Sequence, residues 1–382
     1  MTQVSVIIPS YNQAQFIAST VESVLAQTYP GVEIIVVDDG STDDTRAVLT
    51  AYRDRIRTIR QGNRGLAGAR NTGFHASRGD YLLFLDSDDV IHPDKLASHV
   101  SFLEAERSFG LSYSAWQQVN EDNTQVLGEV RPNKQGQLLK ELLRREFFFF
   151  ASTAVIRREC LERVGLFDES LEWSEDADMW LRLARAGYAF GYLDQPLLQY
   201  RIHGGSMTAH VTPRQVQAWQ ACLAKFFADP GLPDDIRALE PEVYCILHYE
   251  TAGRYYRVGA VDQAQHHLRQ AIHTCTSLDE EWLLQWIAGT ALDPRTRCPE
   301  QLIDRVFDNL PAEAITLRPL RRRAHGRYHA AAAFSAYQSD SLKEARTHVL
   351  PALRGDPSII RNRGFLRVAI QSLLERPQGK RA

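Results

Sequence analysis

The feature that most constrains the fold is the alternation of two hydrophobic patterns over roughly the first 115 residues. Short β-branched runs predict strands, while the stretches between them, such as Gln15–Gln27 and Asp43–Tyr52, place apolar residues at helical spacing. Alternating strands and helices are typical of βαβ units, which build a mainly parallel sheet. The expected strands are Val4–Ile8, Glu33–Asp38, Arg55–Ile59, Tyr81–Leu85 and Leu111–Ser114.

The parallel pattern gives way after the fifth of these strands. Gln117–Val126 predicts two short strands around an Asn/Asp turn, and the strand signals end with Ala189–Leu193 and Leu197–Ile202. From about residue 211 onward the pattern is helical. We therefore expect an α/β domain with a mixed sheet over residues 1–210 and an all-α domain over residues 211–382.

The helical half contains one weak internal similarity, in which a constant offset of 81 residues relates two sets of small and apolar residues. Small residues let paired helices approach closely, as in tetratricopeptide-type hairpins, but that repeat is about 34 residues long and 81 is not a multiple of it. A tetratricopeptide-like repeat is therefore one open interpretation of a helical domain. The first set is Ala252, Tyr256, Ala264, Ala271 and Ile272, and the second is Ala333, Tyr337, Ala345, Ala352 and Leu353.

The composition excludes several classes of protein. Of 382 residues, 44% are hydrophobic and 24% are charged, which is the balance of a globular chain. A net charge of −3 gives no whole-protein attraction to nucleic acid or to an anionic membrane. The 5 cysteines are widely spaced, so they predict neither a disulfide framework nor a zinc site and fit a reducing cytoplasm. Because the amino terminus enters a strand directly and no stretch of ~18 apolar residues exists, we expect a cytoplasmic protein without a cleaved signal.

Three carboxylates lie together at the end of the fourth strand, in the segment Tyr-Leu-Leu-Phe-Leu-Asp-Ser-Asp-Asp over residues 81–89. Open α/β sheets bind ligands at the carboxyl ends of their strands, and hard carboxylate oxygens suit Mg²⁺ or Mn²⁺ carrying a diphosphate. Asp-rich turns also follow strands for structural reasons, since Asp favours turns and helix N-caps. Taken alone, the cluster is equally consistent with both interpretations.

Polar residues also follow the first two strands. Strand one ends in Pro9-Ser10-Tyr11-Asn12 and strand two in Asp38-Asp39-Gly40-Ser41, which we expect at the same edge as the carboxylate cluster. Tyr11 could stack on a planar base, and Asp39 could accept a hydrogen bond from a pyrimidine ring N–H. The alternative for Asp39 is a turn-forming role before Gly40.

A glycine-rich segment, Gln61–Asn71, opens the third helix and contains three glycines with Arg64 and Arg70. A helix N-terminus, exposed amides and guanidinium groups are suited to phosphate oxygens. The segment is neither a Walker loop nor a Gly-x-Gly-x-x-Gly fingerprint. Either arginine could instead be an ordinary surface ion-pair residue.

The ordered combination of these motifs resembles the family 2 glycosyltransferases, which are inverting enzymes of the GT-A fold that use nucleotide-diphospho-sugars. The matching segments are Val-Ile-Ile-Pro-Ser-Tyr-Asn at 6–12, Val-Val-Asp-Asp-Gly-Ser-Thr-Asp at 36–43, Ala-Arg-Asn-Thr-Gly at 69–73 and Phe-Leu-Asp-Ser-Asp-Asp at 84–89. The likeness continues through Gly-Leu-Phe-Asp at 165–168, Trp-Ser-Glu-Asp-Ala-Asp at 173–178 and Tyr-Arg-Ile-His-Gly-Gly-Ser at 200–206. It covers roughly the first 210 residues and implies a GT-A domain with a Rossmann-like mixed sheet.

The resemblance implies a role for each site residue. It places Asp88 on a divalent ion, Mg²⁺ or Mn²⁺, that bridges the two phosphates, and it puts His203 near the diphosphate or the metal. Asp89 either assists or caps the helix expected near Pro93. The residues expected around the nucleotide are Pro9, Tyr11, Asn12, Asp39, Asn63, Gly68, Arg70, Asp86 and Ser87.

Inversion requires a base on the side of the anomeric carbon opposite the diphosphate, and the resemblance places it on Asp176, with Glu175 as the alternative. An exposed Asp with a pKa near ~4 is a weak base, so we expect apolar neighbours or Glu175 to raise the pKa of Asp176. Trp173 and the phenylalanine run at 147–150 could supply those neighbours. The structural alternatives are that the run is plain core and that Asp176 caps a helix.

The predicted function is transfer of a sugar from a nucleotide-diphospho-sugar, expected to be a UDP-sugar, to a hydroxyl of a glycan, glycolipid or lipid-linked acceptor. We expect metal-assisted direct displacement with an Asp base. One alternative is a sugar-nucleotide-binding or scaffold protein whose helical domain recruits partners. Another is a sugar-nucleotide pyrophosphorylase, although strand one lacks the glycine-rich basic loop that such an enzyme needs. The five arginines of Arg318–Arg327 have two interpretations. They could make a peripheral contact with an anionic acceptor or with the inner face of the membrane, or they could form a solvated helix face.

Overall fold

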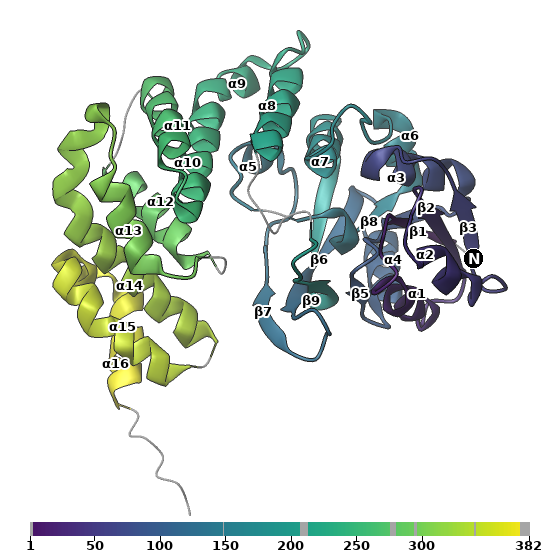
Figure 1. Ribbon diagram of the computed structural model, residues 1–382, viewed down its shortest axis with the longest axis horizontal. Coiled ribbons are helices and arrows are strands. Elements are labelled where there is room, and N and C mark those ends of the chain that lie inside the picture. The colour runs from purple at the N-terminus through teal and green to yellow at the C-terminus, as the bar shows by residue number, and fades with distance from the viewer. Residues whose placement is uncertain are drawn as a thin grey trace, which may run out of the picture. The chain divides into compact units, whose positions relative to one another are not determined.

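The computed structural model describes residues 3–147, 149–206, 213–275, 280–293, 296–339 and 341–374. The chain divides into two compact units, Met1–Leu232 and Pro233–Ala382. The first contains the sheet and the second is helical (Figure 1). Helix α8 (Pro213–Phe227) belongs to the first unit, which therefore extends past residue 210. The residue at which the catalytic domain itself ends stays a prediction.

One mixed sheet organises the first unit, with the strand order β3-β2-β1-β4-β8-β6-β9-β5. Strand β1 (Val4–Ser10) lies between β2 (Val32–Asp38) and β4 (Tyr81–Phe84) and is parallel to both. Strand β3 (Arg57–Arg60) continues the parallel half beside β2. This confirms the βαβ alternation, and it brings the carboxyl ends of β2, β1 and β4 side by side at one edge of the sheet.

The other half of the sheet is mixed in direction. Strand β8 (Ala154–Arg157) is antiparallel to both β4 and β6 (Phe109–Val119), and β6 runs parallel to β9 (Ala189–Arg201). Strand β7 (Val126–Val130) pairs with β6, and the short β5 (Val90–Ile91) pairs with β9. The two strands expected at 189–193 and 197–202 are one strand, because β9 keeps its pairing with β6 across a shift of register.

Helices pack on the sheet through apolar residues. Helix α3 packs tightly on β1, since a Cβ added to its Gly73 would lie 2.2 Å from Ile7 Cγ2. Only glycine permits that approach between a helix and a strand. The helices are α1 (Ile17–Leu25), α2 (Thr45–Thr50), α3 (Gly65–Ala76), α4 (Lys95–Ala105), α5 (Leu139–Leu143), α6 (Arg158–Val164) and α7 (Glu175–Arg185).

Two of the three described phenylalanines of the 147–150 run are core residues, and Phe148 lies outside the described residues. Phe149 is buried and stacks on Trp180 of α7, with ring centroids 4.7 Å apart. Phe150 is buried against Trp116 and Tyr200. The run therefore supports the helix that carries Glu175 and Asp176 by packing beneath it.

The second unit consists of helices joined by short connections. The α-helices are α9 (Asp234–Arg237), α10 (Glu240–Val258), α11 (Val261–Thr274), α12 (Glu280–Leu292), α13 (Pro299–Asp308), α14 (Arg321–Gln338), α15 (Leu342–Gly355) and α16 (Arg363–Leu374). Two 3₁₀ segments, η2 (Ala312–Leu320) and η3 (Pro357–Arg361), lie between them. Among the described residues, no helix is both long and apolar enough to cross a membrane.

The offset of 81 residues corresponds to a duplication of helices. It relates the α10–α11 hairpin to the α14–α15 hairpin, and it also relates α12 to α16, whose buried residues Leu284 and Ile287 match Phe365 and Val368. Each hairpin also holds a pair of histidines with facing Nδ1 atoms. The pairs are His248 with His267 at 3.0 Å, and His329 with His348 at 2.9 Å.

The sequence indicated no disulfide pairing among the cysteines, and for one pair this was wrong. Cys245 of α10 and Cys275 after α11 form a disulfide, with Cα atoms 5.6 Å apart. Their separation of 30 residues gave no signal in the sequence, since it is the helical hairpin that brings them together. In the second copy the corresponding positions are Gly326 and Asp356, where a Cβ on the glycine would lie 2.3 Å from the Asp356 nitrogen.

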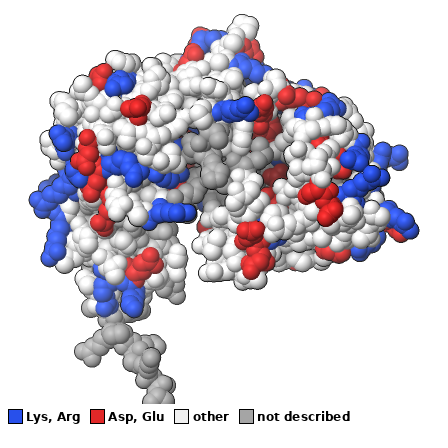
Figure 2. Space-filling view, in the orientation of Figure 1, with Lys and Arg blue, Asp and Glu red and all other residues white. Residues whose placement is uncertain are grey.

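The basic segment Arg318–Arg327 is largely ion-paired. Arg321 contacts Asp304 and Asp308, Arg323 contacts Glu280, and Arg327 contacts Asp356. Figure 2 shows the same mixture of blue and red side chains over the helices of this unit. These pairs favour the solvated helix face, and contact with an anionic acceptor or a membrane stays a prediction.

Candidate active site

The loops after β1 and β2 are joined to each other. The Asn12 amide N–H donates to Ser41 Oγ at 3.0 Å, and Asn12 Oδ1 accepts from the Thr42 N–H at 2.8 Å. Asn12 has a φ of 54°, a left-handed conformation that Asn tolerates better than most residues. Tyr11 beside it is 47% exposed, so its ring is available to a planar group. Pro9 lies within β1 opposite Val37 of β2.

Asp39 is buried and anchors the glycine-rich segment. Its Oδ1 accepts from Gln61 Nε2 at 2.7 Å and from the Arg64 N–H at 2.9 Å, and its Oδ2 accepts from the Gly65 N–H at 2.8 Å. The last two donors belong to the start of α3, where backbone N–H groups lack helical partners. Asn63 Oδ1 also accepts from the Gly65 N–H, at 3.1 Å. Asp39 therefore has a structural role that the turn alternative only partly anticipated.

The two arginines of the glycine-rich segment have different environments. Arg64 is half exposed and pairs with Glu169 at 2.8 Å, as the ion-pair alternative predicted. Gly68 allows this pair to pass over the helix, since a Cβ there would lie 2.7 Å from Arg64 Cβ. Arg70 is buried, with 2% exposure. Its Nη2 donates to Asp86 Oδ1 at 2.8 Å and its Nη1 donates to Glu175 Oε1 at 2.6 Å.

The carboxylate cluster follows β4 as expected, and the structure separates its members. The Asp86 N–H donates to Ser152 Oγ at 3.0 Å, while the Ser87 carbonyl accepts from Thr20 Oγ1 at 2.9 Å. Asp89 is buried and does not cap a helix, because β5 follows it and α4 begins only at Lys95. Burial and the neighbouring carboxylates raise the pKa of Asp89 well above its usual value.

Asp88 and His203 meet at the strand edge. Asp88 Oδ2 lies 3.0 Å from His203 Nε2, and the imidazole packs on the Phe16 ring with centroids 4.5 Å apart. Two adjacent ligands at right angles, each about 2.1 Å from one octahedral ion, are separated by about 3 Å. The donor pair therefore fits one divalent ion. Within the described ranges no group of three or more His, Cys, Asp or Glu side chains is placed to hold a metal ion, so the remaining ligands would come from phosphate oxygens or water.

Asp176 has the properties expected of a base. Burial and the adjacent Glu175 raise its pKa to about 7, although Arg70 and a hydrogen bond from the Ala177 N–H at 2.7 Å oppose the shift. Glu175 and Asp176 begin α7, and the residue before them, Ser174, has a left-handed φ of 64°. That turn directs the chain into the helix. The expectation of a raised pKa at Asp176 is confirmed.

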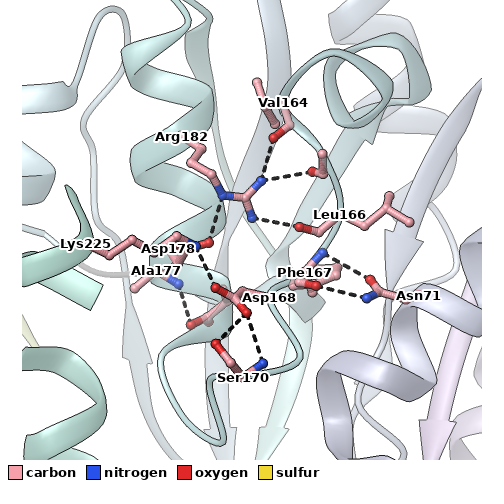
Figure 3. A network of polar contacts seen from close by, with 12 residues as sticks. Asn71, Val164, Leu166, Phe167, Asp168, Ser170, Ala177, Asp178, Arg182 and Lys225 are labelled. Carbon is pink, nitrogen blue, oxygen red and sulfur yellow. Dashed lines mark hydrogen bonds and ion pairs between the residues drawn. The ribbon is translucent and has the colours of Figure 1, made fainter. Parts of the chain in front are cut away.

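The loop between α6 and α7 fastens α7 to α3, as Figure 3 shows. Asn71 of α3 exchanges two hydrogen bonds with the Phe167 backbone, at 2.9 and 3.0 Å. Arg182 of α7 donates to the Val164, Gly165 and Leu166 carbonyls at 2.9, 3.0 and 2.9 Å. Lys225 of α8 joins Asp168 to Asp178, at 2.6 and 3.1 Å. The Gly-Leu-Phe-Asp motif at 165–168 thus holds α3 and α7 together, and α7 begins with Glu175 and Asp176.

Three residues that support the site were not predicted. Arg201 is buried and donates to the Asp88 carbonyl at 2.8 Å and, through its backbone N–H, to Asp89 Oδ1 at 3.2 Å. Its position two residues before His203 in the matched motif was the available signal. Ser152 and the fully buried Lys95 gave none, because isolated serines and lysines have no pattern. Lys95 Nζ donates to the Thr153 carbonyl at 3.0 Å.

Comparison with known proteins agrees with this arrangement. Residues 5–165 match the sequence profile of glycosyl transferase family 2. An Escherichia coli relative, UDP-Glc:alpha-D-GlcNAc-diphosphoundecaprenol beta-1,3-glucosyltransferase WfaP, is 35% identical over 216 residues, which are 55% of this chain and 81% of that protein. The chain belongs to glycosyltransferase family 2. The glycosyltransferase resemblance found in its sequence is therefore confirmed.

Other relatives match this family 2 glycosyltransferase over a similar span. An uncharacterized glycosyltransferase of Rickettsia prowazekii is 32% identical over 212 residues, and the match covers 54% of this chain and 65% of that protein. Just over half of the chain is thus shared with these relatives.

Two solved structures share the fold. Residues 1–349 of TarS from S. aureus, in complex with UDP-GlcNAc, give a TM-score of 0.52 at 20% identity and cover 88% of this chain and 92% of that one. The mannosyltransferase PcManGT from Pyrobaculum calidifontis, in complex with GDP-Man and Mn²⁺, gives a TM-score of 0.52 at 22% identity and covers 81% of this chain and 87% of that one. The GT-A-like mixed sheet followed by helices is therefore confirmed.

Proposed function

We propose that this family 2 glycosyltransferase moves a sugar from a UDP-sugar to an acceptor hydroxyl by inverting displacement, with Asp176 as the base. The observation that carries the proposal is the buried Arg70, which joins Asp86 at the strand edge to Glu175 beside Asp176. The pKa of Asp176, raised to about 7 by burial and Glu175, agrees with this role. A base with a pKa near the working pH removes a proton most effectively. Glu175 is the less suitable base, because its carboxylate accepts from Arg70.

The donor would bind along the carboxyl ends of β2, β1 and β4. Tyr11 is the exposed ring available for stacking on the base, with Pro9 and Asn12 shaping the loop around it. Asp39, Asn63 and Gly68 would act mainly through the backbone that they position, and Asp86 and Ser87 would lie on the ribose side. The name of the WfaP relative, which is 35% identical, includes UDP-Glc, and this supports a uridine donor.

Asp88 and His203 would hold Mg²⁺ or Mn²⁺. When bound, the ion would neutralise the charge that develops on the departing diphosphate. Carboxylate and imidazole together favour Mn²⁺, since Mg²⁺ prefers oxygen ligands. Arg201 would keep the Asp88 backbone in place through its hydrogen bond to the Asp88 carbonyl.

The acceptor would be a hydroxyl of a glycan or a lipid-linked saccharide. The name of the WfaP relative specifies a diphosphoundecaprenol-linked sugar, and the same acceptor class is proposed for this chain. A lipid-linked acceptor would place the enzyme at the cytoplasmic face of a membrane, as a peripheral protein.

A donor screen tests the proposal. The full chain with Mn²⁺ is incubated with UDP-, GDP- and dTDP-sugars and a saccharide acceptor, and the configuration of the new linkage is read by NMR. We expect turnover of a UDP-sugar with inversion, and at least about a hundredfold loss in kcat for Asp176→Asn. Glu172→Gln is the matched control, because Glu172 lies in the same segment but is 72% exposed.

The outcomes separate the alternatives. Retention of configuration, or transfer at the wild-type rate by Asp176→Asn, would refute the proposed mechanism. Release of pyrophosphate from a sugar phosphate and UTP would indicate a pyrophosphorylase. Binding of a UDP-sugar without any turnover in the presence of acceptors would support a binding or scaffold protein.

A further inference from the structure

Arg70 occupies a position that phosphate binding does not explain. Its side chain is buried, with 2% exposure, and its two Nη atoms point to different parts of the chain. One reaches Asp86 after β4 at 2.8 Å, and the other reaches Glu175 at the start of α7 at 2.6 Å. The guanidinium carbon also lies over the Phe167 ring, 5.2 Å from its centroid, which adds a cation–π contact.

Of the two charged partners of Arg70, Glu175 is buried and Asp86 is partly exposed. The exposed fractions of the side chains are 29% for Asp86 and 8% for Glu175. Buried ion pairs contribute little net stability, because the cost of desolvation offsets most of the attraction. Arg70 Nε, moreover, is buried without a hydrogen-bond partner among the described residues. We therefore expect the ion pairs of Arg70 to contribute mainly to the relative positions of Asp86 and Glu175, and little to the free energy of unfolding.

The elements that Arg70 joins have other attachments that do not reach the carboxylates themselves. Asn71 fastens α3 to the loop before α7 through the Phe167 backbone, and Arg182 fastens that loop to α7 (Figure 3). These bonds place the backbones of α3 and α7. Arg70 is the contact that sets the Asp86 and Glu175 side chains relative to each other.

We propose that Arg70 is a positioning residue, whose fork holds Asp86 on the donor side and the Glu175–Asp176 pair on the acceptor side in one fixed arrangement. This inference rests on the proposed role of Asp176 as the base. A planar fork is required, because the single ammonium of a lysine cannot donate along two fixed directions in the same way.

The fork also sets the charge around the base. The groups that face Asp176 are Glu175 on its own helix, Arg70 on α3, Asp86 after β4 and the Cys222 thiol on α8. Glu175 and Asp86 raise the pKa of Asp176, whereas Arg70 lowers it. Because Asp176 must be ionised to act, activity rises with pH through its pKa. Loss of Arg70 should move that acidic limb to higher pH, and loss of the Glu175 charge should move it to lower pH.

The test measures kcat, KM for the donor and the pH dependence of kcat for variants of the full chain. Arg70→Lys keeps the charge, so we expect a loss in kcat of about 10- to 100-fold with the acidic limb near its wild-type position. Arg70→Met should shift the limb up by about one pH unit or more. Glu175→Gln keeps an acceptor oxygen for Arg70 and should shift the limb down. A role limited to folding would lower the active fraction without moving the limb.

Arg158→Met is the matched control, since Arg158 also lies over a phenylalanine of this region, 4.7 Å from the centroid of Phe74, but donates to the Gly79 carbonyl and Ser77 Oγ. The acidic limb of the pH profile of kcat should stay at its wild-type position in Arg158→Met. Wild-type kcat in Arg70→Lys, or a limb unmoved in both Arg70→Met and Glu175→Gln, would overturn the inference. If Arg70→Met does not fold, the kcat of Arg70→Lys and the pH profile of Glu175→Gln still decide. Transfer at the wild-type rate by Asp176→Asn would instead refute the proposed function, so the two failures are distinguishable.

Discussion

Removing the Asp39 carboxylate should destabilise the first unit as well as weaken nucleotide binding. The carboxylate accepts two backbone N–H groups at the start of α3, from Arg64 at 2.9 Å and Gly65 at 2.8 Å, and one from the Gln61 side chain at 2.7 Å. A hydrogen bond to a charged group contributes roughly 1.5–3 kcal/mol. Counting only the two backbone donors at the lower value, Asp39→Ala should cost about 3 kcal/mol.

That loss is large enough to measure by calorimetry. For a unit of the size of Met1–Leu232, 1 kcal/mol corresponds to about 2–4 °C in Tm, so we expect Asp39→Ala to lower the Tm by about 6–12 °C. Asp39→Asn keeps one acceptor oxygen but turns its NH₂ group toward an N–H donor, so it should lose an intermediate amount. Asp44→Ala is the matched control, because Asp44 is exposed, precedes α2 and makes no side-chain cap hydrogen bond.

The two roles of Asp39 can be separated in one experiment. Binding of UDP to each variant is measured by titration calorimetry at a temperature where the variant is folded. A Tm shift of less than about 2 °C in Asp39→Ala, together with lost UDP binding, would refute the structural argument and leave Asp39 a nucleoside contact only.

Three further outcomes are expected. Chelation should abolish transfer, Mn²⁺ should restore it, and Asp88→Asn and His203→Ala should each reduce metal-dependent kcat by about 100-fold or more; metal-independent turnover would contradict the assigned ligands. Gly73→Ala should lower the free energy of unfolding by about 1–3 kcal/mol because its Cβ would overlap β1, whereas Gly62→Ala, with open space around it, should be neutral by urea denaturation. Burial and a facing histidine lower the pKa of His267 to about 4, so the stability contributed by its neutral form should be present above pH 6.5 and lost as the pH falls through about 4. His267→Gln should therefore flatten the dependence of the free energy of unfolding of the second unit on pH in that range. An unchanged pH dependence would contradict this prediction.

The sequence predicted the parallel half of the sheet well, because burial of its strands produces both the apolar runs in the sequence and the core of the fold. Strands β1, β2 and β4 are buried on both faces, so they appear as continuous apolar runs, and their parallel pairing followed from the helices between them. Because these strands are parallel neighbours, their carboxyl ends lie at one edge of the sheet, and this alone predicted that Asp39, Asp86 and Asp88 lie at the same edge. A raised pKa of Asp176 was expected from apolar neighbours or from Glu175, and in the structure burial is the larger of these two causes.

The parts that could not be predicted depend on distant partners. No local pattern indicates that Arg70 reaches Glu175, which lies 105 positions later, or that Asp39 accepts from the start of α3. An arginine beside a glycine-rich loop looks the same in a sequence whether it meets a phosphate or a carboxylate. The disulfide between Cys245 and Cys275 was missed for the same reason, since the geometry of a helical hairpin decides it.

The duplicated helices make the second unit the shortest form of a linear array. In such arrays, stability is approximately the sum of an intrinsic term for each copy and a coupling term for the interface between neighbours. Here the copies α10–α12 and α14–α16 would share one such interface, and only the first copy is cross-linked, by Cys245 and Cys275. The cross-link limits the freedom of the unfolded chain in that copy alone. Under non-reducing conditions the second copy should therefore open first, and reduction should make the two more nearly equal.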